Sequence, residues 1–129
     1  MSQHIALITL VVADYDEAIA FYTQKLGFRL LEDTHLSAEK RWVRVAPPGS
    51  GGAELLLAQA ANPEQVACIG RQTGGRVALF LYTDDIQRDY QRLLAEQVRI
   101  VRAPVREPYG QVLVFSDLYG NLWDLLEPA

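Results

Sequence analysis

The sequence predicts an α+β protein made of two βαβββ modules in tandem. Residues 11–22 and 81–90 look alike at an offset of about seventy residues, and each is an apolar run followed by an Asp-led helix start. Residues 54–56 and 124–126 are also similar at the same offset. Each half reads as a strand, a helix and three further strands. An internal repeat indicates a structural unit that occurs twice in the fold. It therefore predicts the architecture even before the individual helices and strands are assigned.

We expect residues 1–129 to form one domain, with modules at about 1–58 and 75–129 joined by a connector over 59–74. In such a chain the strands form a curved mixed sheet with helices on one face. The other face stays open and concave. The face under the helices must be apolar to form the core. A small-molecule site is therefore expected on the open, concave face.

The first module begins with a strand over residues 5–12, a continuous apolar run with β-branched residues. Asp14 is a good N-cap for the following helix, Glu17 completes a capping box, and Gly27 ends the helix in the left-handed conformation. Three further strands are expected at 28–33, 41–46 and 53–58, with a turn at 47–52.

The second module repeats this order. Residues 76–82 predict a strand, and Asp84 is the expected N-cap of the next helix. Further strands are expected at 98–101, 111–115 and 122–126, with a turn at 119–121. Residues 63–67 have some helical character, but we interpret the whole of 59–74 as a connector.

Strand alternation separates the side chains of the two sheet faces. Apolar parity places the following residues against the helices: Ala6, Ile8, Leu10, Val12, Val43, Val45, Leu55, Leu57, Val77, Leu79, Leu81, Trp123 and Leu125. The open face then carries a few functional groups among apolar neighbours: Trp42, Arg44, Glu54, Arg76 and Asp124. An apolar surface with a few charged groups is typical of a small-molecule site.

Composition and charge exclude several classes of function. Hydrophobic residues make up 50% of the chain and charged residues 22%, which is enough apolar content for a folded core. The net charge of -4 disfavours nucleic acid as a partner. No apolar run approaches the roughly eighteen residues that predict a membrane span. The start of the chain lacks the features of a signal peptide and Cys68 is the one cysteine, so we expect a cytoplasmic protein.

Residues 40–44 combine basic and aromatic side chains, and two interpretations stay open. The segment is an exposed strand edge with one packed tryptophan, or it is a ligand wall. In the second case Trp42 stacks on the ligand and Arg44 or Arg41 meets an anion. Tyr109 precedes the matching strand of the second module, where it covers the pocket or lies in a turn.

Three motifs resemble those of the vicinal oxygen chelate superfamily, which includes glyoxalase I, bleomycin-resistance proteins and extradiol dioxygenases. They are the opening strand and helix (residues 7–12, Asp14, residues 18–22 and residues 26–28), residues 75–79, and residues 115–125. From the first motif to the last, the resemblance extends over residues 7–125. The resemblance implies the tandem βαβββ fold.

In metal-dependent members of that superfamily, four open-face positions bind a divalent ion. Matched by motif, they are Leu7, Glu54, Arg76 and Asp124 here. Leu7 has no donor atom, and the guanidinium of Arg76 has no lone pair for a metal. Two carboxylates are too few for a catalytic zinc ion, although magnesium uses such groups together with waters. We therefore expect no cofactor and no metal, with a divalent ion disfavoured.

Arg76 offers a substitute for the ion. Its permanent charge would stand between Glu54 and Asp124, and a planar guanidinium bonds two carboxylates well. The resulting cluster is neutralised without a metal, and an anionic ligand displaces one partner. The plainer alternative is that Arg76 is a partly solvated strand residue without a partner.

Three functions compete. The first is a metal-independent protein that binds a small anionic or aromatic compound, similar to the drug-sequestering members. The second is a lyase, isomerase or dioxygenase-type enzyme without the usual metal, with Glu54 or Asp124 as general base and Arg76 as electrostatic stabiliser. The third is a metal-dependent enzyme with other ligands. The missing ligand set favours the first two, and nothing in the sequence separates them.

The resemblance also implies an assembly. In single-chain members of this length it implies a homodimer whose two sites each draw strands from both subunits. Glu54 then comes from one chain, and Arg76 with Asp124 comes from the other.

Overall fold

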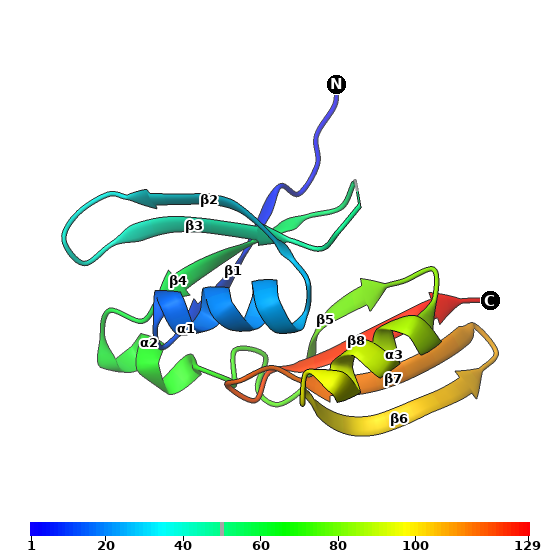
Figure 1. The fold of residues 1–129 in the computed structure, drawn as a ribbon. Coiled ribbons are helices and arrows are strands. Elements are labelled where there is room, and N and C mark those ends of the chain that lie inside the picture. Colours follow the sequence, from blue (N-terminus) through cyan, green and yellow to red (C-terminus); the bar gives the residue numbers. More distant parts are fainter. Residues whose placement is uncertain (50) are drawn as a thin grey trace. The chain divides into compact units, whose positions relative to one another are not determined.

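The computed structural model describes every residue of the chain except Ser50, which belongs to the expected turn at 47–52. The chain divides into two compact units, Met1–Ile69 and Gly70–Ala129, here called the N-terminal and the C-terminal unit. Each unit has one four-stranded sheet with a helix on one of its faces (Figure 1). The tandem βαβββ prediction is confirmed, and the boundary falls inside the expected connector. The expectation that both units make one domain stays a prediction.

The N-terminal unit consists of these elements: β1 (Leu7–Val12), α1 (Tyr15–Ala20), its π-helical continuation η1 (Phe21–Lys25), β2 (Arg29–His35), β3 (Arg41–Ala46), β4 (Glu54–Gln59) and α2 (Pro63–Cys68). The strand order is β1-β4-β3-β2. The β1–β4 pair is parallel and the other two pairs are antiparallel, so the sheet is mixed as expected. The short helix α2 lies in the segment 59–74, which we interpreted from the sequence as a connector.

The first helix begins and ends where the sequence predicts. The carboxylate of Asp14 accepts a hydrogen bond from the backbone N–H of Glu17 at 2.8 Å. At the other end the helix widens into the π-helical turn, where Leu26 N–H donates to the Phe21 carbonyl at 3.2 Å. Gly27 follows with φ 75°, a conformation that other residues rarely adopt.

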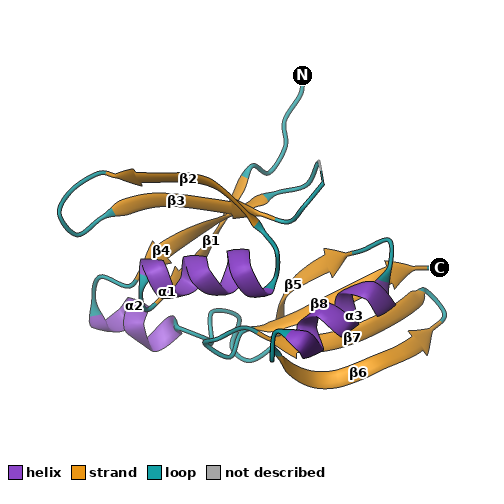
Figure 2. Cartoon of the chain, viewed as in Figure 1, coloured by secondary structure: helices purple, strands orange, loops and turns teal. Residues whose placement is uncertain are grey.

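The C-terminal unit consists of these elements: β5 (Val77–Tyr82), α3 (Ile86–Ala95), β6 (Arg99–Glu107), β7 (Gly110–Ser116) and β8 (Leu122–Pro128). The strand order, β5-β8-β7-β6, repeats the topology of the other unit (Figure 2). Strand β6 extends well beyond the expected 98–101, because register shifts on either side of Arg102 let the β6–β7 pair continue to the Glu107–Gly110 turn.

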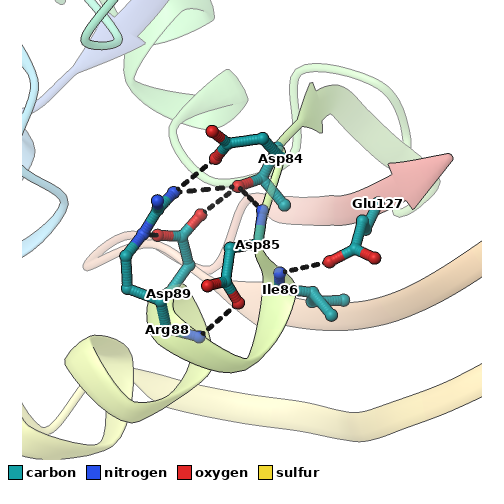
Figure 3. A network of polar contacts seen from close by, with 7 residues as sticks. Asp84, Asp85, Ile86, Arg88, Asp89 and Glu127 are labelled. Atoms are coloured by element: carbon teal, nitrogen blue, oxygen red, sulfur yellow. Dashed lines mark hydrogen bonds and ion pairs between the residues drawn. The ribbon is translucent and has the colours of Figure 1, made fainter.

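The start of α3 corrects one prediction. The N-cap is Asp85, whose carboxylate accepts from the backbone N–H of Arg88 at 3.0 Å. Asp84, the expected cap, instead receives the guanidinium of Arg88 at 2.8 Å (Figure 3). The backbone N–H of Ile86, the first residue of α3, donates to the carboxylate of Glu127 on β8 at 2.9 Å. This contact fixes which of the two adjacent aspartates begins the helix.

Each unit has its own apolar core between sheet and helix. The predicted parity is confirmed at the most buried positions, where exposure is 5% or less: Leu10, Val12, Val43, Val45, Leu55, Leu57, Trp123 and Leu125. The rings of Phe115 and Trp123 stack with centroids 5.7 Å apart. Burying one such apolar side chain stabilises the fold by about 1.5–3 kcal/mol. Ile8, expected under the helix, is 40% exposed.

The turn before β8 is built around a buried carboxylate. Asp117 is 4% exposed, and its Oδ1 accepts from the backbone N–H groups of Tyr119 and Asn121, both at 2.9 Å. The side-chain amide of Asn121 donates to Oδ2 at 2.8 Å. Turn formation therefore explains why Asp and Asn occur in the motif at residues 115–125. Their side chains bond backbone groups that would otherwise be buried without partners.

Among the described residues, no helix is long and apolar enough to cross a membrane.

Candidate functional site

A pocket of about 430 Å³ lies on the face of the N-terminal sheet opposite the buried side chains. Its wall combines an indole ring, charged groups and small apolar residues: His4, Ala6, Leu7, Glu32, Trp42, Arg44, Gly52 and Glu54. The strand ladder explains this grouping. Leu7 on β1 is paired with Glu54 on β4, and Arg44 on β3 is paired with Glu32 on β2. Side chains that share a face of neighbouring strands must meet.

Arg44 holds the polar side of the pocket together. Its Nε donates to Oε1 of Glu32 at 3.0 Å, and its Nη1 donates to Oε1 of Glu54. The Thr34 hydroxyl donates to the second oxygen of Glu32 at 2.9 Å. Bonding to Arg44 and then to Thr34 lowers the pKa of Glu32, and the two carboxylates raise the pKa of Arg44. Glu32 and Arg44 are therefore both ionised at neutral pH.

Three of these pocket residues were predicted as site residues from the sequence, and the structure places them together: Trp42, Arg44 and Glu54. Their part in binding a ligand stays a prediction. Glu32 is a pocket residue that sequence reasoning did not identify. The signal that finds it is the β2–β3 ladder, which sets Glu32 directly across from Arg44.

Arg41 does not line this pocket. Its guanidinium donates to Asp33 at 3.0 and 2.6 Å and to Asp16 at 2.9 Å. It also lies over the ring of Tyr15, 5.0 Å from the centroid. Arg41 shares strand parity with Val43 rather than with Trp42, so it faces the helix side. There it ties the β2–β3 hairpin to the start of α1. That it meets a ligand stays a prediction, which this pocket does not support.

Asp124 lies on the open face of the C-terminal sheet. Its ladder neighbours are Phe80 on β5 and Val114 on β7, and Arg102 on β6 is paired with Val114 in the same row. Burial raises the pKa of the Asp124 carboxyl, and the charge of Arg102 partly offsets this effect. Phe80 is 63% exposed, so an aromatic ring stands beside a carboxyl that is easier to protonate than usual.

The structure corrects one part of the predicted charge cluster, the pair of Arg76 with Asp124, while the role of Arg76 in ligand binding stays a prediction. It precedes β5, is exposed, and its carbonyl accepts from the Thr73 hydroxyl at 2.7 Å. The ladder sets Phe80, four residues further on, beside Asp124. Within the described part of the C-terminal unit, no ion pair joins Arg76 to Asp124, because about four residues of extended strand separate their ladder positions. Within the N-terminal unit Glu54 is paired with Arg44. Its expected meeting with Arg76 of another subunit stays a prediction.

The internal repeat also needs a correction at the last strand of each unit. One ladder row reads Thr9, Leu56, Arg44 and Glu32 across the N-terminal sheet, and the matching row reads Phe80, Asp124, Val114 and Arg102. The difference in residue number between matching positions is 71 for β1 and β5 and 70 for β3 and β7. For β4 and β8, the last strand of each sheet-forming repeat, it is 68. In the ladder Asp124 therefore corresponds to Leu56, and not to Glu54.

Among the described residues, no group of three or more His, Cys, Asp or Glu side chains is arranged to hold a metal ion. The carboxylate of Glu54 is engaged by Arg44, and its ladder neighbour Leu7 has no donor atom. The ladder neighbours of Asp124 are Phe80 and Val114, which also have none. Tyr109, the remaining predicted ligand-binding residue, lies in the turn between β6 and β7 and is 56% exposed. Its role stays a prediction.

Comparison with known proteins gives a consistent result. The family model described as "Glyoxalase/Bleomycin resistance protein/Dioxygenase superfamily" matches residues 3–125. An uncharacterized protein of Shewanella frigidimarina (strain NCIMB 400) is 59% identical over 128 residues, which is 98% of this chain and 95% of that protein. The solved structure of UcmS2 is 31% identical with a TM-score of 0.84, over 98% of both chains. TnmS3, described as an antibiotic binding protein from Streptomyces sp. CB03234, is 32% identical with a TM-score of 0.79, over 99% of this chain and 98% of that one.

Proposed function

This chain belongs to the Glyoxalase/Bleomycin resistance protein/Dioxygenase superfamily, and we propose that it binds a small organic molecule without a metal ion. The observation that carries the proposal is the pocket of about 430 Å³ in which Trp42, Leu7 and the Arg44–Glu54 pair share one wall. Small-molecule sites are hollows of this size with apolar walls and a few fixed polar groups. The similarity to TnmS3, described as an antibiotic binding protein, supports the same class of function.

The sequence predicts a ligand that is aromatic or anionic, and the pocket favours the aromatic one. The indole of Trp42 is half-buried in the wall and offers a flat surface for stacking. Arg44, the cation expected to meet an anion, is already bonded to two carboxylates. Metal independence belongs to the same proposal, because the donors on each unit's open face fit a metal poorly.

Tryptophan fluorescence tests this proposal directly. The chain has two tryptophans, and Trp123 is 3% exposed in the core of the C-terminal unit. A ligand in the pocket should therefore change the emission of Trp42. We expect saturable quenching by aromatic compounds with and without EDTA, and no quenching in a Trp42→Phe variant. Stoichiometric divalent metal in protein purified without chelators, or loss of binding with EDTA, would contradict metal independence.

A second candidate function is an enzyme that transfers a proton, of lyase or isomerase type. The observation that favours it is Asp124, whose carboxyl has a pKa raised by burial beside Phe80. A general base is most effective when its pKa approaches the working pH. Activity that survives EDTA and is lost in Asp124→Asn would support this function over simple binding.

We also propose a cytoplasmic homodimer. The single cysteine, Cys68, is exposed and unpaired, which suits a reducing compartment. The family resemblance supports sites shared between two subunits. Light scattering at micromolar concentration should give twice the mass of 14.4 kDa, and a monomer would contradict the shared site.

A further inference from the structure

The charged groups of the pocket do not balance. Glu32 and Glu54 are two carboxylates, Arg44 is one guanidinium, and the three together carry a formal net charge of -1. The lowered pKa of Glu32 keeps this carboxylate ionised well below neutral pH. The pocket therefore presents a negative potential to an entering molecule, in a chain whose own net charge is -4.

One carboxylate oxygen of the pocket is available for a ligand. Both oxygens of Glu32 are engaged, Oε1 by Arg44 and Oε2 by the Thr34 hydroxyl. Glu54 uses Oε1 for Arg44, and among the described residues nothing donates to its Oε2. Glu54 lines the pocket with a side-chain exposure of 32%, so its carboxylate is reachable from the pocket. It accepts hydrogen bonds and cannot donate one while ionised.

A carboxylate ligand meets two obstacles in such a pocket. It has to compete with Glu32 and Glu54 for the guanidinium of Arg44. If it displaces one of them, three negative groups then surround a single cation. A ligand with an N–H donor meets neither obstacle, because Oε2 of Glu54 takes that donor and the Arg44 bonds stay intact.

From these observations we infer that the pocket selects an aromatic compound carrying a protonated amine and rejects aromatic carboxylates. The amine bonds Oε2 of Glu54, while the aromatic part lies against the indole of Trp42. A cation near that ring gains further attraction from its π-electrons. The inference rests on the proposed binding function and names the class of ligand that the same pocket takes.

Three matched probes test the inference on the full chain by isothermal titration calorimetry at pH 7.5. They are 1-naphthylmethylammonium, neutral 1-naphthalenemethanol and 1-naphthylacetate. We expect the ammonium to bind about tenfold more tightly than the acetate, with the alcohol between them. The preference for the ammonium should shrink as the salt concentration rises from 50 to 500 mM, because added salt screens charge.

Two variants locate the selectivity. Glu54→Gln should bring the affinities for ammonium and acetate to within about threefold of each other, since the acceptor loses its charge. Glu39→Gln removes the same charge from an exposed position outside the pocket and should leave the preference unchanged. Circular dichroism shows whether each variant is folded. If Glu54→Gln does not fold, Glu32→Gln serves instead and should weaken the preference in the same direction.

The outcomes separate the ligand class from the binding function. Acetate binding as tightly as the ammonium would overturn the ligand class and leave small-molecule binding in place. No heat of binding from any of the three probes at millimolar concentration, with no change in Trp42 fluorescence, would overturn both. An equal effect of Glu39→Gln and Glu54→Gln would overturn the assignment of the selectivity to this pocket.

Discussion

The two units share the way in which they fix a helix on a sheet and differ in what their open faces carry. Asp14 and Asp85 cap the two helices, and the first helical N–H group donates to Gln59 on β4 in one unit and to Glu127 on β8 in the other. The open faces show no such likeness. One carries the bonded set Glu32–Arg44–Glu54, and the other carries Asp124 beside exposed aromatic rings.

This difference shows which face of the sheet is free to change between the two repeated units. The helix-facing residues must fill a core and satisfy helix ends, so they keep their chemistry in both units. The open-face residues contribute less to the stability of either unit. They can diverge, and recognition is expected where they have done so.

The largest expected effects test the equivalence of the two cores. Leu57 and Leu125 hold matching ladder positions and are 0% and 2% exposed. Replacing either with Ala should lower the free energy of unfolding by about 2–5 kcal/mol, because a cavity is left behind. Urea denaturation measures both variants. A loss below about 1 kcal/mol in one of them would mean that the two cores are not packed alike.

A smaller effect tests a feature that only the N-terminal unit has. Arg41 bonds Asp33 and Asp16 and covers Tyr15, whereas the matching position on β7 is Gln111. Arg41→Ala should cost about 1–3 kcal/mol of unfolding free energy, and Arg41→Lys should cost less because it keeps the charge. Gln111→Ala is the matched control and should lie within about 0.5 kcal/mol of the unchanged protein. Equal losses at both positions would remove the contrast.

The helix-start bonds should be alike in both units. Gln59→Ala leaves the backbone N–H of Tyr15 without its partner at 3.1 Å, and Glu127→Ala does the same to Ile86. Each change should cost about 1 kcal/mol, the usual effect of losing a cap. Thermal denaturation followed by circular dichroism compares them. A large loss in one unit with none in the other would show that the repeated contact does not serve the same purpose.

The smallest effects concern pH, and here the units should respond in opposite directions. The folded pKa of Glu32 is lowered, first by its bond to Arg44, so its stabilisation is present above the unfolded pKa and is lost as the pH falls through the folded pKa. The folded pKa of Asp124 is raised by burial, so the chain loses stability as the pH rises from the unfolded to the folded pKa of that group.

Carboxyl NMR titration measures both values. Glu32 should titrate below its ordinary pKa and Asp124 above its own, and Arg102→Ala should raise the pKa of Asp124 further. Asp124→Asn should stabilise the protein at pH 7 but not below the unfolded pKa of the aspartate. A lowered pKa at Asp124 would show that Arg102 outweighs burial.

The fold was predictable from the sequence because it rests on periodicity. Alternation in β3, β4 and β8 identified the buried faces, and Asp14 marked a helix start that needs no distant partner. The start of α3 was not predictable in the same way. Asp84 and Asp85 both satisfy the cap rule, and the choice is fixed by Glu127, which lies some forty residues away in the chain.

The site was predictable only in part, for the same reason. Trp42, Arg44 and Glu54 follow from strand parity, which is a local property. Glu32 becomes a neighbour of Arg44 only through a ladder that shifts register between Leu30 and Glu32. Pairing across strands depends on such shifts, which the sequence does not announce. The predicted pairing of Arg76 with Asp124 was wrong because motif spacing was taken for ladder spacing.

The offset of 68 residues at the last strand, against 70 and 71 elsewhere, has an evolutionary consequence. A strand that slides by one residue turns its buried side chains outward, but a slide by two keeps every side chain on its face. Two residues gained or lost in a turn therefore carry a reactive group about 7 Å along the sheet while the core stays intact. Paired insertions and deletions give such a protein a way to exchange one chemistry for another without first becoming unstable.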